Sequence, residues 1–236
     1  MRVLGIDTST ADASVALTDG DEPVSELTAG PGPDGRPQHS RALLAELERA
    51  VEAGGGWGEV ERIAVGLGPG SYTGLRIGIA TARALAQARR IPIAGVGSLA
   101  ALARGIDAHP TAEGRLALPV LDARSGQVFA ALHDPGGAEV WPPFVIEPEE
   151  LAERLQALDS PPLAAGDGAL RFATELEAGG ATVAPPKDAV HRISARQVCA
   201  LGEAAAEVPP GRIEPNYLRA PDANRWLQRD RSEPAG

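Results

Sequence analysis

The sequence predicts an α/β protein made of two similar halves, and three observations support this fold class. Short apolar runs typical of strands alternate with segments of helical spacing. The segment VLGIDTSTADASVAL, residues 3–17, resembles LPVLDARSGQVFAAL, residues 118–132, and this pairs Asp7 with Asp122. A glycine-rich loop leads into a long helical segment in GLGPGSYTGLRIGIATARALA, residues 66–86. The repeated strand–Asp–turn–strand unit indicates a duplicated α/β domain, unless two short segments match by chance.

The first half is expected to open with a three-stranded meander and to continue with alternating helices and strands. Its first helix has a single apolar stripe, and its second ends at two arginines, which favour a helix C-terminus. The expected elements are strands at residues 2–7, 13–18 and 24–28, a helix at 39–52, a strand at 61–67, a helix from the glycine loop to residues 89–90, a strand at 91–96 and a helix at 97–105.

The second half begins near residues 109–115. It is expected to contain strands at 116–123 and 126–134 around a turn, a polar Pro-rich stretch, a helix at 148–158, a strand and turn at 163–169, and a helix at 194–208 with Ser194 as N-cap. We therefore predict an N-terminal subdomain at residues 1–105, a C-terminal subdomain at 106–208 and an extended tail at 209–236 that frays at its end.

Composition and charge narrow the function classes. Of the 236 residues, 43% are hydrophobic and only 3% are aromatic, so stacking platforms for nucleic-acid bases are not expected. The net charge of −10 disfavours direct, tight nucleic-acid binding by this chain alone. A single cysteine excludes an intrachain disulfide, and the first ten residues resemble neither a signal peptide nor a transit peptide. No apolar run has membrane-spanning length, so the expected location is the cytoplasm.

Two loops have residues suited to phosphate chemistry. Asp7, followed by Thr8, Ser9 and Thr10, offers a carboxylate and three hydroxyls that can hold a hydrated metal ion and contact a phosphate. The alternative is a turn whose hydroxyls satisfy the backbone. Backbone N–H groups of the glycine loop can cradle an anion at a helix N-terminus. That loop lacks the Walker lysine and the dinucleotide spacing, which favours a tight strand-to-helix turn.

Small residues recur every four positions on the second helix, at Gly74, Gly78, Ala82 and Ala86. Such a ridge lets another helix approach closely. That other helix can belong to the same chain, in which case the ridge is buried. If the ridge is exposed, it forms a surface for a partner protein. The residues alone leave both interpretations open.

Metal and nucleophile motifs are absent from the sequence. None of the four histidines, at positions 39, 109, 133 and 191, lies three to five residues from another, so no metal pair is available on a helix or strand. Cys199 falls inside an amphipathic helix and is expected in the core. No GxSxG elbow, catalytic triad or zinc motif supports a peptidase.

Several segments together resemble the TsaB (YeaZ) family, in family order between Arg2 and Arg219: VLGIDTST…ASVAL, GLGPGSYTGLRIGIATARALA, PIAGVGSLAALA, LDARSGQVFAAL and EPNYLR. The family is a bacterial subunit of the machinery that makes threonylcarbamoyl-adenosine beside the tRNA anticodon. The resemblance implies an actin/Hsp70/sugar-kinase-like (ribonuclease H-like) fold, with two duplicated subdomains of mixed sheets flanked by helices. The loop AGPGPDGRPQHS is richer in Gly and Pro than the family pattern, which leaves the start of the first helix open.

The resemblance also implies a non-catalytic subunit, a degenerate paralogue of the catalytic TsaD. TsaD holds its metal with a His-x-x-x-His motif on a helix, whereas the comparable helix here has His39 and, four residues on, Leu43. The chain is then expected to need no cofactor or metal itself, with ATP or ADP bound at the complex. The expected partners are TsaD in a heterodimer, TsaE, and a second copy when the chain is alone. tRNA is expected to bind only through the complex.

The resemblance places two sets of residues at functional positions. The partner interface is expected on the first two helices of the N-terminal subdomain, at His39, Leu43, Leu47, Gly74, Arg76, Ile77, Gly78, Thr81, Ala82 and Leu85. A vestigial nucleotide site is expected at Asp7, Thr8, Ser9, Gly68, Gly70 and Ser71.

The rival hypothesis is an ATP-dependent small-molecule kinase of the same superfamily. Asp7 would hold Mg²⁺, the glycine loop would hold phosphate, and Asp122 is the only obvious general base for the acceptor hydroxyl. ATP turnover by the isolated chain, abolished by Asp7→Ala, would support this hypothesis.

Overall fold

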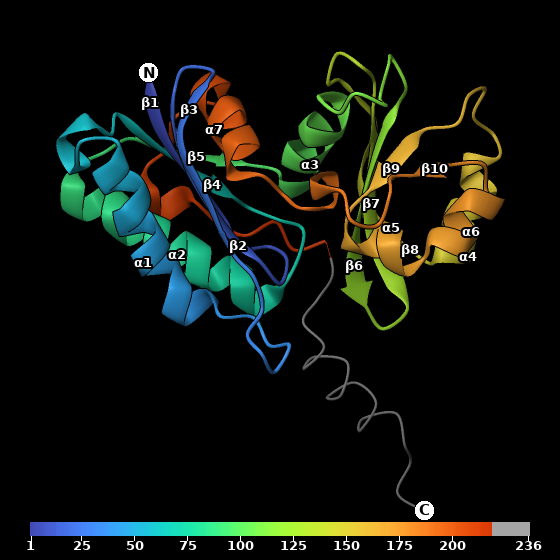
Figure 1. Cartoon of the computed structure of the whole chain (residues 1–236), viewed down its shortest axis with the longest axis horizontal. Helices are drawn as coiled ribbons and strands as arrows, with labels where there is room; N and C mark the ends of the chain where they lie inside the picture. Colours follow the sequence, from blue (N-terminus) through green and yellow to red (C-terminus); the bar gives the residue numbers. More distant parts are fainter. Residues whose placement is uncertain (219–236) are drawn as a thin grey trace, which may run out of the picture.

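The computed structural model describes residues 1–218, which form two lobes with one five-stranded mixed sheet each (Figure 1). The first sheet contains β1 (Arg2–Asp7), β2 (Ala13–Asp19), β3 (Glu22–Ala29), β4 (Arg62–Gly66) and β5 (Ile93–Val96). The second contains β6 (Ala117–Arg124), β7 (Gln127–His133), β8 (Glu139–Ile146), β9 (Leu163–Ala165) and β10 (Thr182–Val183).

The two sheets have the same topology. The strand order of the first is β3-β2-β1-β4-β5, and that of the second, read from β8, is β8-β7-β6-β9-β10. In each sheet the first three strands are antiparallel neighbours, and the last two add in parallel. Asp7 ends β1 and Asp122 lies near the end of β6, the equivalent central strand. The predicted duplication and the sugar-kinase-like fold class are therefore confirmed.

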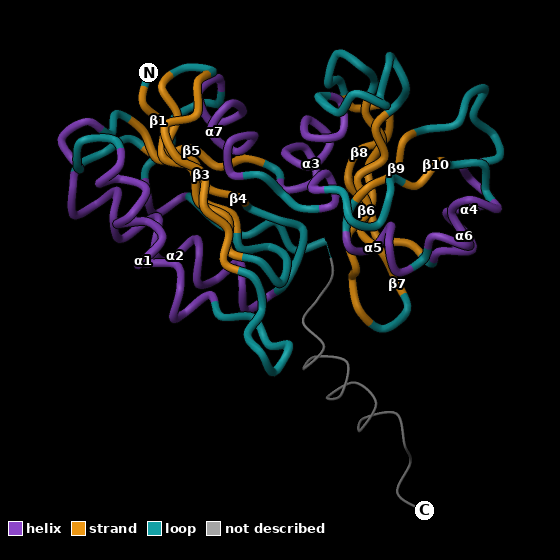
Figure 2. The backbone as a smooth tube through the Cα atoms, viewed as in Figure 1, coloured by secondary structure: helices purple, strands orange, loops and turns teal. Residues whose placement is uncertain are grey.

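The helices form three layers around the two sheets. They are α1 (His39–Ala53), α2 (Tyr72–Arg89), α3 (Ser98–Asp107), α4 (Pro148–Leu155), α5 (Asp167–Arg171), α6 (Ala173–Ala178) and α7 (Ala195–Ala204), with 3-10 turns η1 (Trp57–Glu59), η2 (Ala189–His191) and η3 (Pro210–Arg212). Helices α1 and α2 cover the outer side of the first sheet, and α4 to α6 cover that of the second (Figure 2). Helices α3 and α7 pack together between the sheets.

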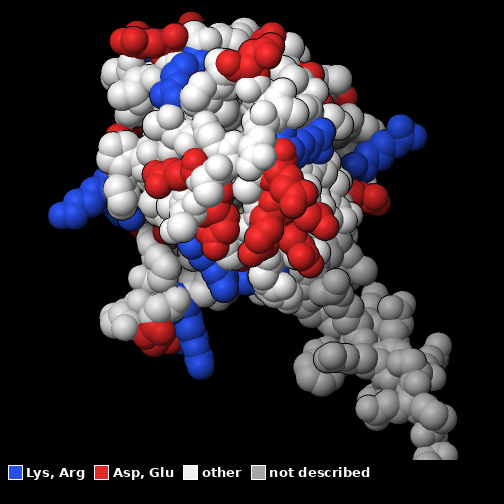
Figure 3. Space-filling view, turned by 90° about the vertical axis from the view of Figure 1, so that its right-hand side faces the viewer, with Lys and Arg blue, Asp and Glu red and all other residues white. Residues whose placement is uncertain are grey.

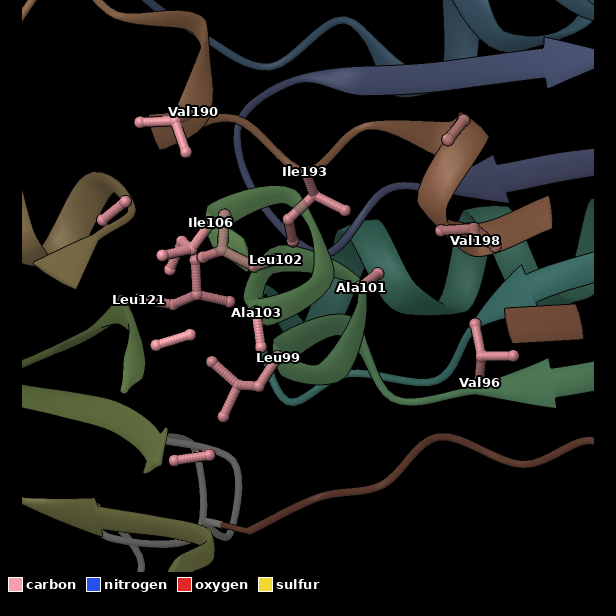
Figure 4. Packing of buried hydrophobic residues seen from close by; sticks show 14 of the residues in the cluster. Val96, Leu99, Ala101, Leu102, Ala103, Ile106, Leu121, Val190, Ile193 and Val198 are labelled. Carbon is pink, nitrogen blue, oxygen red and sulfur yellow. The ribbon is translucent and has the colours of Figure 1, made fainter. Parts of the chain in front are cut away.

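The core is continuous between the lobes because α3 and α7 lie at their junction. The side chains of Leu99, Leu102 and Ile106 on α3 meet Leu121 of β6 and Ile193, which precedes α7 (Figure 4). Helix α7 itself packs against β1, β2 and β4 of the first lobe, although it follows the second sheet in sequence. The division of the chain at residues 105 and 208 stays a prediction.

Most predicted elements are confirmed, and the exceptions have physical reasons. The α1 helix begins at His39 despite the Gly- and Pro-rich loop before it. Strand β8 occupies the stretch described from the sequence as polar and Pro-rich, with no strand predicted. Pro142 and Pro143 interrupt its apolar run, but β8 lies at a sheet edge, where a missing N–H is tolerated. Ser194 occupies the N-cap position of α7, but its hydroxyl donates a hydrogen bond to Glu26 instead of capping the helix.

Cys199 lies in the core, as predicted. Its side chain is fully buried, and Sγ donates a hydrogen bond to the Val3 carbonyl oxygen at 3.2 Å. Burial raises the pKa of the thiol to about 12. The thiol is therefore neutral at physiological pH and has no nucleophilic character. Among residues 1–218, none of the helices combines the length and apolar character needed to span a lipid bilayer.

Candidate functional site

The Asp7 side chain is buried inside the first lobe and hydrogen-bonded through both carboxylate oxygens. The side chain is 1% exposed, and Oδ1 accepts hydrogen bonds from the Ser9 backbone N–H at 2.8 Å and from the Ser9 hydroxyl at 2.6 Å. Oδ2 accepts a third bond from the Ser98 hydroxyl at 2.7 Å. Burial raises the pKa of the Asp7 carboxyl above its ordinary value, and these hydrogen bonds oppose the rise. The carboxylate joins β1 to the start of α3 and does not line the cleft between the lobes.

The glycine loop uses its polar groups within the chain. The Gly68 N–H donates to the Ser98 hydroxyl oxygen, and the Ser98 N–H donates back to the Gly68 carbonyl. The Ser71 N–H donates to the carbonyl of Ser9, and the Ser71 hydroxyl caps α2 by accepting from the Gly74 N–H. Gly70 passes so close to Ser9 that a Cβ atom there would collide with the Ser9 carbonyl. The loop is a tight strand-to-helix turn.

The predicted nucleotide residues divide into two groups, and the nucleotide site itself stays a prediction: Asp7, Thr8 and Gly68 are hydrogen-bonded within the chain, whereas Ser9, Gly70 and Ser71 line the cleft between the lobes. A phosphate cradle needs free N–H groups, whereas the loop amides of Gly68 and Ser71 are already paired. A hydrated magnesium ion needs an accessible carboxylate, and Asp7 is buried with both oxygens occupied. Thr8 also faces inward, donating its hydroxyl proton to the Gly74 carbonyl at 2.8 Å.

The small-residue ridge of α2 packs inside the protein, against the turn after β1. The ridge residues were expected at a surface for a partner protein, and their burial corrects that expectation. A Cβ atom on Gly74 would collide with the Thr8 carbonyl, and one on Gly78 would collide with the Thr8 hydroxyl. Ala82 and Ala86 are also buried. The ridge lets α2 approach the turn after β1.

The residues of the expected partner interface divide into buried and accessible sets. The buried set packs within this chain and consists of His39, Leu43, Leu47, Gly74, Gly78 and Ala82. The set that reaches the surface consists of Arg76, Ile77, Thr81 and Leu85. On α1 the outermost apolar side chain is Leu44, which is 57% exposed and was not among the expected interface residues. The interface itself stays a prediction.

His39 is a core histidine without a second imidazole. It is 4% exposed, and its Nε2 has no hydrogen-bond partner within the described part of the chain. Its Cε1 lies beside Gly74, and His39 is the smallest of the influences that lower the pKa of Asp7. Leu43, one helical turn further on, is 1% exposed. Residues 1–218 contain no group of three or more His, Cys, Asp or Glu side chains that could hold a metal ion.

A cleft of about 190 Å³ lies between the lobes, and the sequence anticipated only part of it. Its lining comes from the turn after β1, the start of α2, the β6–β7 hairpin, α5 and the C-terminal segment: Ser9, Thr10, Ala11, Pro69, Gly70, Ser71, Tyr72, Thr73, Asp122, Ala123, Arg124, Phe129, Asp167, Asn216, Tyr217 and Leu218. The Asn216 N–H donates to the Leu67 carbonyl at 2.7 Å, which fixes the C-terminal segment beside the glycine loop.

The carboxylates of Asp122 and Asp167 line the cleft, and each contacts charged or polar neighbours. Asp122 receives the Arg171 guanidinium on Oδ2 at 2.8 Å, and its backbone N–H donates to Asp167 Oδ1 at 2.9 Å. Burial raises the pKa of Asp167, and the negative charge of Asp122 raises it further. Arg124 also lines the cleft, and its guanidinium lies 3.9 Å from Asp122 Oδ2, so the cleft contains charges of both signs. The ion pair with Arg171 occupies the Asp122 carboxylate, which argues against a role as general base.

Sequence reasoning missed Asp167, Arg171 and the aromatic pair in the cleft. Asp167 lies in a Gly-Asp-Gly sequence at the start of α5, a position predicted as a turn. The rings of Tyr72 and Tyr217 stack with centroids 5.1 Å apart. The only available signal was compositional, since these are the two tyrosines of the chain.

Comparisons with known proteins agree with this fold. A profile of the family described as "TsaD: tRNA N6-adenosine threonylcarbamoyltransferase" matches residues 34–165. The "tRNA threonylcarbamoyladenosine biosynthesis protein TsaB" of Escherichia coli is 32% identical over 71% of this chain and 72% of that protein. The protein of the same name from Bacillus subtilis is 30% identical over 97% of this chain and 99% of its own length.

Solved structures give the same result. An uncharacterized Pseudomonas aeruginosa protein "with similarity to peptidase YEAZ" superposes with a TM-score of 0.76 and 26% identity, covering 92% of this chain and 99% of that one. The ROK hexokinase of Thermus thermophilus shares the fold at a TM-score of 0.50 and 16% identity, over 85% of this chain and 99% of the hexokinase. By sequence and by structure, the chain belongs to the TsaB/YeaZ family, within the sugar-kinase-like fold.

Proposed function

We propose that this chain takes part in the biosynthesis of threonylcarbamoyladenosine in tRNA, as a non-catalytic subunit that binds and supports TsaD. Family membership supports the pathway, because the relatives from Escherichia coli and Bacillus subtilis carry that function in their names. The observation that carries the non-catalytic role is the burial of Asp7, which the Ser9 and Ser98 hydrogen bonds hold away from the cleft.

The accessible face formed by α1 and α2 is the proposed site for TsaD. Leu44 on α1 is 57% exposed, and Ile77, Thr81 and Leu85 reach the surface of α2 on the side facing α1. Apolar side chains exposed together on two packed helices are typical of a helix–helix interface. The same face would pair two copies of this chain when TsaD is absent.

The proposal also covers the third subunit, the nucleotide and the location of the reaction. TsaE joins the heterodimer, ATP or ADP binds at the complex, and this chain contributes no metal or cofactor of its own. The reaction takes place on tRNA in the cytoplasm. The kinase alternative has less support, because the Gly68 amide and the Asp7 carboxylate already form hydrogen bonds with Ser98 within the chain.

Reconstitution tests the proposal. Purified TsaD and TsaE from the same organism, threonylcarbamoyl-adenylate and an unmodified tRNA transcript are combined with and without this chain, and modified adenosine is measured by mass spectrometry. We expect modification to require the chain. The variant Leu44→Glu places a charge on the proposed face and is expected to reduce both TsaD binding and modification.

A matched control is Val140→Glu on β8, where the side chain is 46% exposed on the other lobe. This variant should bind TsaD and support modification like the unaltered chain. Equal modification with and without the chain would refute the subunit role. ATP turnover by the isolated chain would then favour the kinase.

A further inference from the structure

An exposed aromatic stack stands at the mouth of the cleft. Tyr72 and Tyr217 are 37% and 40% exposed, and their rings are tilted by 30° at a centroid distance of 5.1 Å. The guanidinium carbon of Arg76 lies 4.5 Å from the centre of the Tyr72 ring. Within residues 1–218 the stack ends at Tyr217, whose exposed ring can accept a further planar group.

A row of arginines continues from this stack along α2. Arg76, Arg83 and Arg90 are spaced by seven residues, which is two helical turns, so they lie along one edge of the helix. Helix α2 contains no acidic residue, and Arg212 on the adjoining η3 adds a fourth cation. None of these four arginines forms an ion pair with any residue in the described range 1–218. We call these four residues, with Tyr72 and Tyr217, the arginine edge.

The arginine edge borders a groove between α2 and the C-terminal segment. One part, of about 540 Å³, is lined by Ala80, Arg83, Ala84, Gln87, Pro210 and Gly211. A second part, of about 580 Å³, continues past Arg90 and Ile91 to Glu207. Glu207 is the acidic side chain in this lining, and the Arg62 guanidinium binds its carboxylate. The groove is thus positively charged in a protein of net charge −10.

Apart from Arg76, which is also among the expected interface residues, the arginine edge lies on a different side of α2 from the proposed TsaD face. Gly74 contacts His39 of α1, so positions Ile77, Thr81 and Leu85 on the same side of the helix face α1. Arg83 and Arg90 lie on the opposite side, against the segment from Glu207 to Gly211. Figure 3 shows a group of acidic side chains on the face of the second lobe that carries α4 and α6.

We propose that the arginine edge docks a single-stranded segment of tRNA. Guanidinium groups spaced along a groove bind phosphates of one RNA strand, and a base continues the stack on Tyr217. An RNA loop offers both features, whereas an acidic protein surface offers only the charge. The inference rests on the proposed function, which makes tRNA the substrate of the complex. It revises the expectation that tRNA binds only through the complex.

Fluorescence anisotropy with the full chain tests this proposal without TsaD. The probes are a labelled RNA hairpin carrying the anticodon loop of an unmodified tRNA and a blunt RNA duplex of equal length, titrated over a series of salt concentrations. We expect the hairpin to bind more tightly than the duplex. Tyr217→Ala should weaken hairpin binding about tenfold and leave the salt slope unchanged.

The double variant Arg83→Glu, Arg90→Glu should weaken binding of the hairpin and lower the slope of log Kd against log salt by about 0.7 for each phosphate that is no longer bound. Lys187→Glu, an equal charge change per site at an exposed position of the second lobe, should leave binding unchanged. Thermal unfolding of each variant confirms that it is folded.

Two outcomes would overturn the proposal. One is absent hairpin binding, or binding that none of the arginine-edge variants alters. The other is loss of TsaD binding in the arginine variant with RNA binding intact, which would make the edge a protein-binding surface. Either outcome leaves the proposed function standing, since the reconstitution assay measures the requirement for this chain independently.

Discussion

The hydroxyl of Ser98 donates a 2.7 Å hydrogen bond to the carboxylate of Asp7 and accepts another from the Gly68 N–H. One side chain at the start of α3 thereby fixes the end of β1 and the glycine loop. All three groups are buried, so no water replaces a missing bond.

Ser98→Ala should destabilise the protein by about 1–3 kcal/mol, because it leaves the Asp7 oxygen and the Gly68 N–H without a partner. The measurement is urea unfolding followed by circular dichroism. Ser40→Ala, at an exposed position on α1, is the control and should change the free energy of unfolding little. Equal stability of both variants would show that the Ser98 bonds contribute nothing net.

Gly78→Ala should destabilise the protein by about 1–3 kcal/mol, because the added Cβ collides with the Thr8 hydroxyl. The matched control is Gly105→Ala on α3, where the nearest atom to the new Cβ is 4.0 Å away. That variant should gain up to about 1 kcal/mol from helix propensity. A stable Gly78→Ala protein would mean that α2 shifts freely, contrary to the packing described.

Asp167→Asn should change how stability depends on pH. The pKa of Asp167 in the folded protein lies above its ordinary value of 3.8, so the folded state holds the proton more tightly than the unfolded state. The stability that Asp167 contributes is present below pH 3.8 and is lost as pH rises through the folded-state pKa. The stability of Asp167→Asn relative to the unaltered chain should therefore rise from pH 4 to pH 7 in chemical denaturation.

The variant Asp188→Asn is an internal control, because its stability relative to the unaltered chain should change with pH in the opposite direction. The Val190 N–H, and then His109, lower the pKa of Asp188 below 3.8. Its contribution is present above that pH and is lost as pH falls through the folded-state pKa. Asp188→Asn should therefore lose stability at pH 7 relative to pH 3, and parallel curves for the two variants would contradict these assignments.

The Cys199 thiol should not react with a thiol reagent in the folded protein. It is fully buried, its pKa is about 12, and it forms a hydrogen bond to the Val3 carbonyl. Labelling with 5,5′-dithiobis(2-nitrobenzoic acid) should be complete in guanidinium chloride and negligible in buffer. Rapid labelling in buffer would show that α7 separates from β1 under native conditions.

Periodicity and turn residues predicted most of the fold, because both signals are local. Strands β1 and β2 and helices α1 and α2 follow directly from apolar spacing and from the glycines between them. Strand β8 escaped prediction because two prolines outweigh its apolar residues until its edge position is known. The two-residue β10 has no local signal at all.

The candidate site was harder to predict because the residues that contact one another there are far apart in the sequence. An aspartate before three hydroxyl residues suggests a metal or phosphate site, and only the fold places Ser98 against Asp7. Likewise, Tyr72 and Tyr217 become a stack only when the C-terminal segment returns to the glycine loop. The residues of the small-residue ridge of α2 left internal packing and a partner surface both open, and the family resemblance favoured the partner surface; in the structure, Gly74 and Gly78 pack on Thr8, in the turn after β1.

Helices α3 and α7 each pack on the lobe opposite to the one that their place in the chain suggests, and they pack on each other. A hinge motion that separates the lobes would therefore remove Leu102 and Ile106 from contact with their apolar neighbours. Core packing between the lobes therefore opposes any change in the width of the cleft. A partner protein that binds one lobe thereby also determines the orientation of the other lobe.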